Sequence, residues 1–191
     1  MTAIDRKTFF DVMASFPSGV AIVTTVAEDG VPRGLTTTAV CSVSADPPTV
    51  LVCVDIGSRT LAALRARGRF VVNFIGEGRS ELCLLFASKE EDKFAHVSWR
   101  ATRDGIPLLH DDVLAWAECS TIHELEVGDH VLLVGHVEDG GVQPELEPPL
   151  MYYRRSWGVW SPVHEADEPD PVSIPAMEVS GRDLRWQGAE F

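Results

Sequence analysis

Polar residues cluster between Gly34 and Thr60, where the sequence reads GLTTTAVCSVSADPPTVLVCVDIGSRT. Three threonines, at positions 36 to 38, stand in one predicted strand that ends at the rigid corner Asp46-Pro47-Pro48. A strand that is polar where a core strand would be apolar usually faces a ligand or water. Ser58-Arg59-Thr60 begins a predicted helix, and such a start offers hydroxyls and free backbone N–H groups to an anion. Together these features suggest a site for a flat polar ring system that carries a phosphate.

Residue patterns for metal or Rossmann-type chemistry are absent from the sequence. The cysteines form no CxxC pair, so zinc spacing is missing and we expect buried free thiols: Cys41, Cys53, Cys83 and Cys119. No G-x-G-x-x-G motif follows a predicted strand, which argues against a Rossmann domain. Five of the histidines show no paired metal spacing: His96, His110, His123, His136 and His164. We therefore expect no metal site.

The charge balance excludes some classes of partner. The 191 residues include 16 basic and 29 acidic ones, a formal net charge of −13. This argues against binding to nucleic acid or to an anionic membrane, although local arginines and helix-end amides can still hold a phosphorylated cofactor. No apolar run reaches the roughly 18 residues of a membrane span, and the start MTAIDRKTFFDVM lacks a secretory pattern. The expected location is the cytoplasm.

Short elements are expected to carry these residues. The pattern predicts helices over 5–16, 58–68 and 80–87, and strands over 20–27, 34–45, 49–54, 70–75, 113–126 and 130–137. Asp29-Gly30 is a hairpin signal, so the strand from Gly34 should lie antiparallel to the one before it. Ser58 is the predicted N-cap of the second helix, and Gly68 ends it. Asn73, inside an apolar strand, is expected to make a structural hydrogen bond to the backbone.

Mostly hairpin-connected strands favour a mainly β fold, a closed or nearly closed antiparallel barrel with short helices inserted. Residues 1–160 form the expected domain. Residues 161–191 form a tail with four prolines from Pro162 onward, too polar to bury much apolar area. Two interpretations of the tail stay open: it is mobile, or Trp186 and Phe191 anchor it on its own domain or on a partner subunit.

Seven motifs stand in an order that resembles the short-chain flavin reductase family. They are FPSGVAIVTT (16–25), GLTTTAVCSVSADPP (34–48), SRT (58–60), FVVNFI (70–75), DKF (92–94), GDH (128–130) and PLMYYRRSW (149–157). The resemblance covers residues from about 9 to 157 and implies the FMN-binding split barrel, an antiparallel split β-barrel with short helices inserted.

The resemblance also implies where a flavin binds. The strand along the isoalloxazine ring is matched by Thr36, Thr37, Thr38 and Ala39, although the family often has Ala, Asn and Ser at the last three positions. The strand along the ring and the ribityl chain is matched by Cys53, Val54 and Asp55. Ser58, Arg59 and Thr60 match the phosphate end, where Arg59 offers a bidentate contact. For Ser58, simple helix capping is the alternative, and the carboxylate of Asp55 must point away or serve the ribityl hydroxyls.

Three more residues complete the expected site. The resemblance places His130 near the reactive face of the flavin, in contact with nicotinamide; a surface turn histidine is the alternative. Asp129 can hydrogen-bond the imidazole or cap the turn. Phe94 shapes the pocket in the family, whereas the sequence alone fits a charged turn with Phe94 tucked under it. Trp157 stands where the family often has tyrosine and would close the flavin or nicotinamide pocket.

The implied function is an NAD(P)H:flavin oxidoreductase that reduces FMN or FAD by hydride transfer and supplies reduced flavin to a separate monooxygenase. A homodimer is implied as well. The alternatives are a split-barrel flavoprotein that retains its flavin and acts on an organic substrate, and a non-catalytic flavin-binding electron carrier. FMN versus FAD, NADH versus NADPH and the identity of the partner oxygenase stay open.

Overall fold

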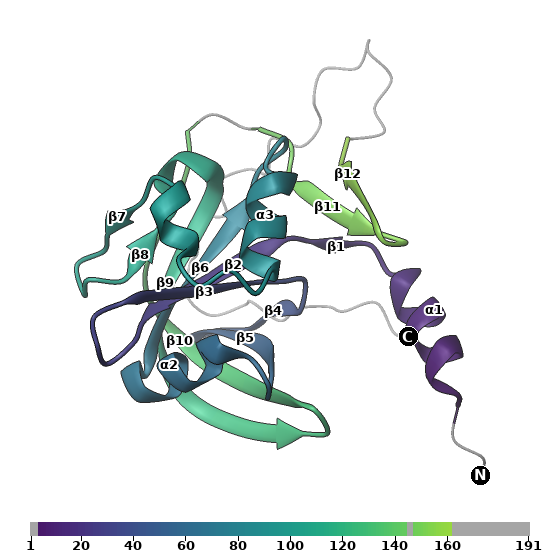
Figure 1. The fold of residues 1–191 in the computed structure, drawn as a ribbon, viewed down its shortest axis with the longest axis horizontal. Coiled ribbons are helices and arrows are strands. Elements are labelled where there is room, and N and C mark those ends of the chain that lie inside the picture. Colours follow the sequence, from purple (N-terminus) through teal and green to yellow (C-terminus); the bar gives the residue numbers. More distant parts are fainter. Residues whose placement is uncertain (1–3, 145–146, 162–191) are drawn as a thin grey trace. The chain divides into compact units, whose positions relative to one another are not determined.

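A seven-stranded antiparallel sheet forms the centre of the computed structural model, which describes residues 4–144 and 147–161 (Figure 1). The strand order is β3-β2-β6-β9-β10-β5-β4. The strands are β2 (Ala21–Val26), β3 (Pro32–Thr37), β4 (Val40–Ala45), β5 (Pro48–Asp55), β6 (Arg69–Ile75), β9 (Val113–Val127) and β10 (His130–Val142). The expected mainly β, antiparallel architecture is confirmed. In the described residues no ladder joins the outer strands β3 and β4, so the sheet does not close through hydrogen bonds.

Two smaller sheets and short helices complete the fold. One sheet contains β1 (Ser18–Gly19), β11 (Leu150–Tyr153) and β12 (Ser156–Val159), and the other contains β7 (Arg100–Ala101) and β8 (Pro107–Leu108). The helices are α1 (Arg6–Ala14), α2 (Arg59–Arg67), α3 (Ser80–Ala87) and the 3-10 turns η1 (Lys93–His96) and η2 (His110–Asp112). Ser58 caps α2, and Gly68 ends it in the left-handed conformation with φ 64°, as the sequence predicts. The predicted tail lies outside the described residues from residue 162 onward.

The strand predicted over 34–45 is two strands, and this prediction was wrong. β3 pairs with β2, whereas β4 pairs with β5 on the opposite edge of the sheet. The break lies at Thr38 and Ala39. The Thr37 hydroxyl accepts a hydrogen bond from Ala39 N at 3.0 Å, and Ala39 O accepts one from Cys53 N at 3.0 Å. These bonds direct the chain away from β2, so that the next strand, β4, pairs with β5.

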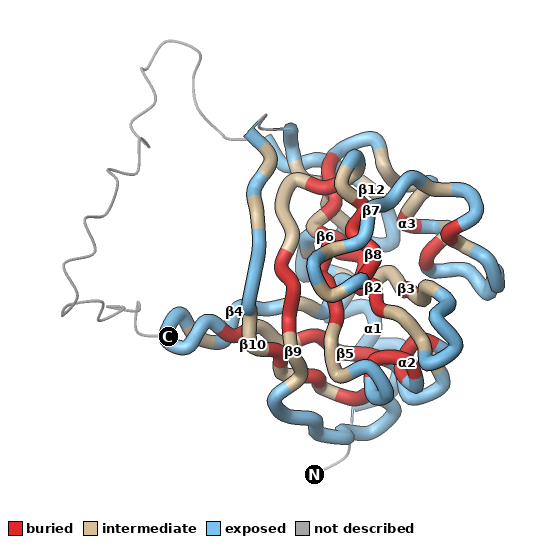
Figure 2. Tube along the Cα trace, turned by 90° about the vertical axis from the view of Figure 1, so that its left-hand side faces the viewer, coloured by how far each residue is buried: buried red, intermediate tan, exposed pale blue. Residues whose placement is uncertain are grey.

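The core lies on both faces of the central strands. β2 and β6 are buried almost throughout, as the red tube in Figure 2 shows. One face packs Ile22 and Val71 with Phe86 of α3, and the other packs Val23 with Leu64 of α2. Helices α2 and α3 therefore cover opposite faces, and each is fixed by the apolar residues that it buries.

Asn73 ties the small hairpin β7–β8 to the central sheet. Its side-chain amide donates to Ile22 O at 2.9 Å and to Thr24 Oγ1 at 3.0 Å, and its oxygen accepts from Leu109 N at 3.0 Å. The residue is fully buried, so these bonds replace the water that the amide loses. The predicted structural role of Asn73 is confirmed.

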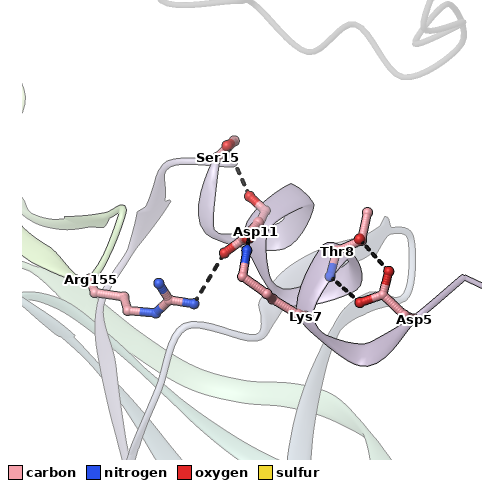
Figure 3. A network of polar contacts seen from close by, with 6 residues as sticks. All are labelled: Asp5, Lys7, Thr8, Asp11, Ser15 and Arg155. Carbon is pink, nitrogen blue, oxygen red and sulfur yellow. Dashed lines mark hydrogen bonds and ion pairs between the residues drawn. The ribbon is translucent and has the colours of Figure 1, made fainter.

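Helix α1 is held by polar contacts, which Figure 3 shows. Asp5 caps its first turn by accepting from Thr8 N at 3.0 Å, and Arg155 lies 3.5 Å from the carboxylate of Asp11. Its apolar face is exposed: Phe9, Val12, Met13 and Phe16 keep between 49% and 67% of their surface in solvent. The helix forms as predicted, but in one chain its apolar face remains uncovered.

Candidate functional site

A cleft of about 1680 Å³ lies between five segments, which come from four separate parts of the sequence. Its walls are the β2–β3 turn with β3, the end of β5, the first two turns of α2, the segment from Phe86 to Phe94, and His130 at the start of β10. The β-strands fix three of these segments through the central sheet, and α2 and α3 pack on its faces. The cleft is therefore built on the rigid part of the fold.

Ten of the thirteen residues predicted for the site line this one cleft. They are Thr36, Thr37, Cys53, Val54, Asp55, Ser58, Arg59, Thr60, Phe94 and His130. In the part of the chain that the structure describes, Thr38, Ala39 and Trp157 are not among the lining residues. Thr38 borders a second cavity of about 320 Å³, and Ala39 is exposed at the break between β3 and β4.

The hydroxyls of the two threonines that reach the cleft from β3 make hydrogen bonds within the protein. Thr36 Oγ1 donates to Cys83 O of α3 at 2.7 Å, and Thr37 Oγ1 accepts from Ala39 N. The polar strand is explained in part by these bonds. What β3 presents to a ligand is therefore mainly its backbone, together with the Thr37 hydroxyl, which accepts from Ala39 N and keeps its own proton.

The end of β5 turns directly into the start of α2. Asp55 Oδ1 accepts from Gly57 N at 2.6 Å, and its backbone oxygen accepts from Ser58 N at 2.9 Å. The carboxylate is thus engaged in the turn through its bond with Gly57 N. Beside it, burial and then the nearby Cys41 raise the pKa of the Cys53 thiol, which favours the neutral form.

The free thiols differ in exposure, and the expectation that all four are buried was wrong. Cys83 and Cys119 are buried, Cys53 is half-buried, and Cys41 is exposed. Cys41 lies on β4, an edge strand whose outward face has no cover within the described chain. An edge position accounts for the difference, since an apolar neighbourhood in the sequence does not reveal which strands are central.

The three residues predicted for a phosphate play different parts. Ser58 Oγ accepts from Thr60 N at 3.3 Å, so the capping alternative is confirmed, and the hydroxyl keeps its proton for another acceptor. Thr60 is buried, and its hydroxyl donates to Gly34 O at 3.2 Å. Arg59 donates to Lys89 O at 2.5 Å and to Glu90 O at 3.0 Å. Thr60 and Arg59 therefore hold cleft walls together.

His130 begins β10, directly after the tight turn of the β9–β10 hairpin. Gly128, with φ 61°, makes the tight turn, and His130 Nδ1 lies 2.7 Å from Asp129 Oδ1. The hydrogen bond from His130 lowers the pKa of the Asp129 carboxyl, so Asp129 favours its negatively charged form. The carboxylate in turn favours a proton on Nδ1 of His130. The predicted support of His130 by Asp129 is confirmed.

Both interpretations of the DKF motif describe part of the structure. Phe94 is buried, with its ring centroid 5.1 Å from that of Phe86 and 6.0 Å from that of Trp99. The segment also forms a wall of the cleft. Sequence reasoning missed Lys93 and Arg33, two cations that line it. The DKF motif contained the signal for Lys93, but no role was assigned to it.

Trp157 belongs to a separate aromatic pair. It stands in β12, with its ring centroid 4.9 Å from that of Tyr152 in β11. Together they pack against the core cluster that contains Phe86. Within the described residues of one chain, Trp157 is part of this small sheet and does not line the cleft.

The charges of the cleft are mixed. Four lysines and arginines line it, and so do six carboxylates: Arg33, Arg59, Lys89, Lys93, Glu28, Asp29, Asp55, Glu90, Glu91 and Asp92. An anion must therefore be recognised by local geometry and not by a general positive field. In residues 4–144 and 147–161, no group of three or more metal-ligating side chains is found, and no helix is long and apolar enough to cross a membrane.

Comparison with known proteins identifies similar chains. The family described as "Flavin reductase like domain" matches residues 13–161. A flavin reductase (NADH) of Kitasatospora aureofaciens is 44% identical over 163 residues, which is 85% of each protein. The reductase subunit HsaB of a flavin-dependent monooxygenase from Mycobacterium tuberculosis is 38% identical over 79% of this chain and 80% of its own. The structure of the NADH:FAD oxidoreductase SgcE6 of Streptomyces globisporus, in complex with NAD and FAD fragments, has a TM-score of 0.78 at 28% identity and covers 86% of this chain and 100% of that one.

Proposed function

The chain belongs to the flavin reductase like domain family, and on this premise we propose that it is an NAD(P)H:flavin oxidoreductase. It reduces FMN or FAD with NADH or NADPH and supplies the reduced flavin to a separate monooxygenase. Relatives named as reductase subunits of monooxygenases support the last point. The cytoplasmic location remains a prediction from the sequence.

The observation that supports the proposal most is the meeting of ten predicted residues in one cleft. They come from four stretches of sequence separated by up to 94 positions, from Thr36 to His130, and nothing but the fold brings them together. The cleft offers a backbone strand for a flat ring, and a hydroxyl and cations at its α2 end for a phosphate. This donor set fits a flavin nucleotide.

The residues of the chain have separate tasks in this reaction. A bound flavin supplies the ring that accepts a hydride from reduced nicotinamide. β3 and the end of β5 orient that ring, and Ser58 donates to the phosphate. His130, with Nδ1 held by Asp129, offers Nε2 to the nicotinamide carboxamide. Holding two rings in contact removes the entropy cost of their encounter, so neither a nucleophile nor a metal is required.

The architecture that we propose is the FMN-binding split barrel, formed by residues 1–160 and followed by a separate tail from 161 to 191. The chain crosses from β3 to β4, which lie at opposite edges of the seven-stranded order, and this wrapping supports a barrel that stays open between them.

A homodimer is also proposed, with a second copy of the chain on the outer face of β9, β10, β5 and β4. On β10, Val131 and Leu133 are buried while Leu132 and Val134, on the opposite face, are only half-buried. Leu132 pairs with Cys53, and His130 is on the same face, so this apolar surface continues into the cleft. A second copy seated there would adjoin both flavin sites.

The dimer has a direct test. Leu132→Glu places a charge on the proposed face and is expected to shift the sedimentation coefficient to that of a monomer. Leu84→Glu, at an exposed position on α3, is the matched control and should leave the assembly unchanged. A wild-type protein that sediments as a monomer would refute the dimer.

The reaction is tested by NADH and NADPH oxidation with FMN or FAD added. His130→Ala is expected to reduce turnover by about 10- to 100-fold while flavin affinity stays within about threefold, because the histidine contacts nicotinamide. His96→Ala, at an exposed position on η1 outside the lining of the cleft, should behave as the wild type. No oxidation by the wild type with either nucleotide and either flavin would sink the proposal.

A further inference from the structure

Lys93 is one of the two cleft cations that sequence reasoning missed. Its ammonium donates to Phe86 O at 2.6 Å and to Gly34 O at 3.3 Å, and it lies 5.8 Å from the centre of the Phe86 ring. An ammonium has three N–H donors. Within the described residues the third has no acceptor, and Lys93 takes part in no ion pair.

The ammonium of Lys93 lies beside the first turn of α2. Gly34 O accepts from both Lys93 Nζ and Thr60 Oγ1, so the two donors are neighbours around one atom. Burial, and then the positive charge of Arg59, lower the pKa of Lys93. Two cations thus approach each other at the α2 end of the cleft. An anion bound there would offset both the burial of the Lys93 charge and its repulsion by Arg59.

Arg59 is not available in the same way. Its Nη2 donates to the carbonyls of Lys89 and Glu90, and its Nη1 lies 3.7 Å from the Glu91 carboxylate. A phosphate that took this guanidinium would release the segment 88–92 that forms one wall. Arg59 is therefore placed to hold the wall, and not to meet the ligand.

The backbone donors at the start of α2 are also largely used. Gly57 N and Ser58 N donate to Asp55, and Thr60 N donates to Ser58 Oγ. The helix start alone is thus a weaker anion site than its sequence indicates. Among nearby carboxylates, Asp55 accepts from Gly57 N and Asp92 from Ala95 N, and within the described residues no ion pair joins either of them to Lys93.

We propose that Lys93 is the cation that recognises the phosphate of the flavin nucleotide, and that Arg59 is a positioning residue that fixes the wall carrying Lys93. This inference rests on the proposed function, since it assigns one group of that site. The phosphate is the terminal one of FMN or the corresponding one of FAD, because both ligands share it next to the ribityl chain.

The test compares FMN with riboflavin, which lacks the phosphate, by quenching of flavin fluorescence without any nicotinamide. Lys93→Met removes the charge and keeps a long side chain. It is expected to weaken FMN by roughly 10- to 100-fold and riboflavin by less than about threefold, because a hydrogen bond to a charged group is lost. Lys93→Arg should restore most of the FMN preference.

Two matched variants separate position from charge. Lys7→Met removes the same charge at an exposed position on α1, outside the lining of the cleft, and should leave the FMN to riboflavin ratio unchanged. Arg59→Gln should weaken both ligands alike, because the wall loosens without a phosphate contact being lost.

An unchanged FMN to riboflavin ratio in Lys93→Met would overturn the proposal, whether both affinities persist, both fall equally, or the phosphate-specific loss appears in Arg59→Gln instead. A wild type that binds FMN no more tightly than riboflavin would overturn it too. Failure of the proposed function would be recognised by a different result, namely flavin binding without oxidation of NADH or NADPH. The ratio of FMN to riboflavin affinity is measured without turnover, so the two failures can be distinguished.

Discussion

Replacing Gly34 by alanine tests how the floor of the cleft is built. A Cβ at this position would lie 2.6 Å from Phe86 Cε1, 2.8 Å from Phe86 Cδ1 and 3.3 Å from Val23 O. The Phe86 ring is 1% exposed and packs edge-on against Phe94, so it has little room to move. Because β3 at Gly34 is not in the left-handed region, the destabilising effect of the substitution is steric.

The expected loss in the free energy of unfolding of Gly34→Ala is about 1–3 kcal/mol, the usual cost of overpacking a core. For a chain of this size each kcal/mol lowers the melting temperature by roughly 2–4 °C. FMN should also bind more weakly, because Phe86 O and Gly34 O position the Lys93 ammonium.

Gly19→Ala is the matched control, since its Cβ meets nothing within 4 Å among the described residues. There a reduced entropy of the unfolded chain predicts a gain of about 0.4–1 kcal/mol. The assay is urea unfolding followed by tryptophan fluorescence, with an FMN titration of both variants. Equal stability of Gly34→Ala and Gly19→Ala would refute the steric reasoning.

Three further predictions concern other parts of the molecule. Asn73→Ala should lower the free energy of unfolding by about 2–4 kcal/mol, since Leu109 N loses its acceptor and a cavity forms; a loss under about 1 kcal/mol in urea unfolding would contradict this. Burial raises the pKa of Cys83 and Cys119 to about 12 from 9.0, so their contribution to stability is full below pH 9.0 and falls as pH rises toward 12. The free energy of unfolding in urea should therefore fall more steeply over that pH range for the wild type than for Cys83→Ala. Parallel curves for the two proteins would count against this prediction. Ser58→Ala should cost about 1 kcal/mol through the lost cap and Ser58→Gly only a few tenths, yet both should weaken FMN more than riboflavin; a flavin affinity that follows stability alone would show that Ser58 only caps the helix.

Features of the fold that depend on neighbouring residues could be predicted from the sequence. Helix α2 is an example, because a serine cap and a terminal glycine enclose it within eleven positions, Ser58 to Gly68. The break at Thr38 and Ala39 could not be predicted, because it depends on Cys53 drawing Ala39 toward β5. The uncovered face of α1 is of the same kind, since periodicity shows that a face is apolar but not what covers it.

The site shows the same division. Most of its expected residues meet in the cleft because they follow the order of a family pattern and the fold brings that order together. The tasks of Arg59 and Lys93 were not readable, because their acceptors are backbone oxygens of Lys89, Glu90, Phe86 and Gly34. Any residue offers such an oxygen, so its type leaves no signal in the sequence. Three-dimensional proximity alone separates the arginine that holds the wall from the lysine that faces the cleft.

The most direct test of the central claim is an anaerobic titration of the purified chain, mixed with FMN or FAD, with NADH and with NADPH while the flavin absorbance is followed. We expect the oxidised flavin band to disappear as one equivalent of at least one nucleotide is added, and much more slowly in His130→Ala. If the band persists with both flavins and both nucleotides, the cleft does not support hydride transfer and the proposed function is wrong.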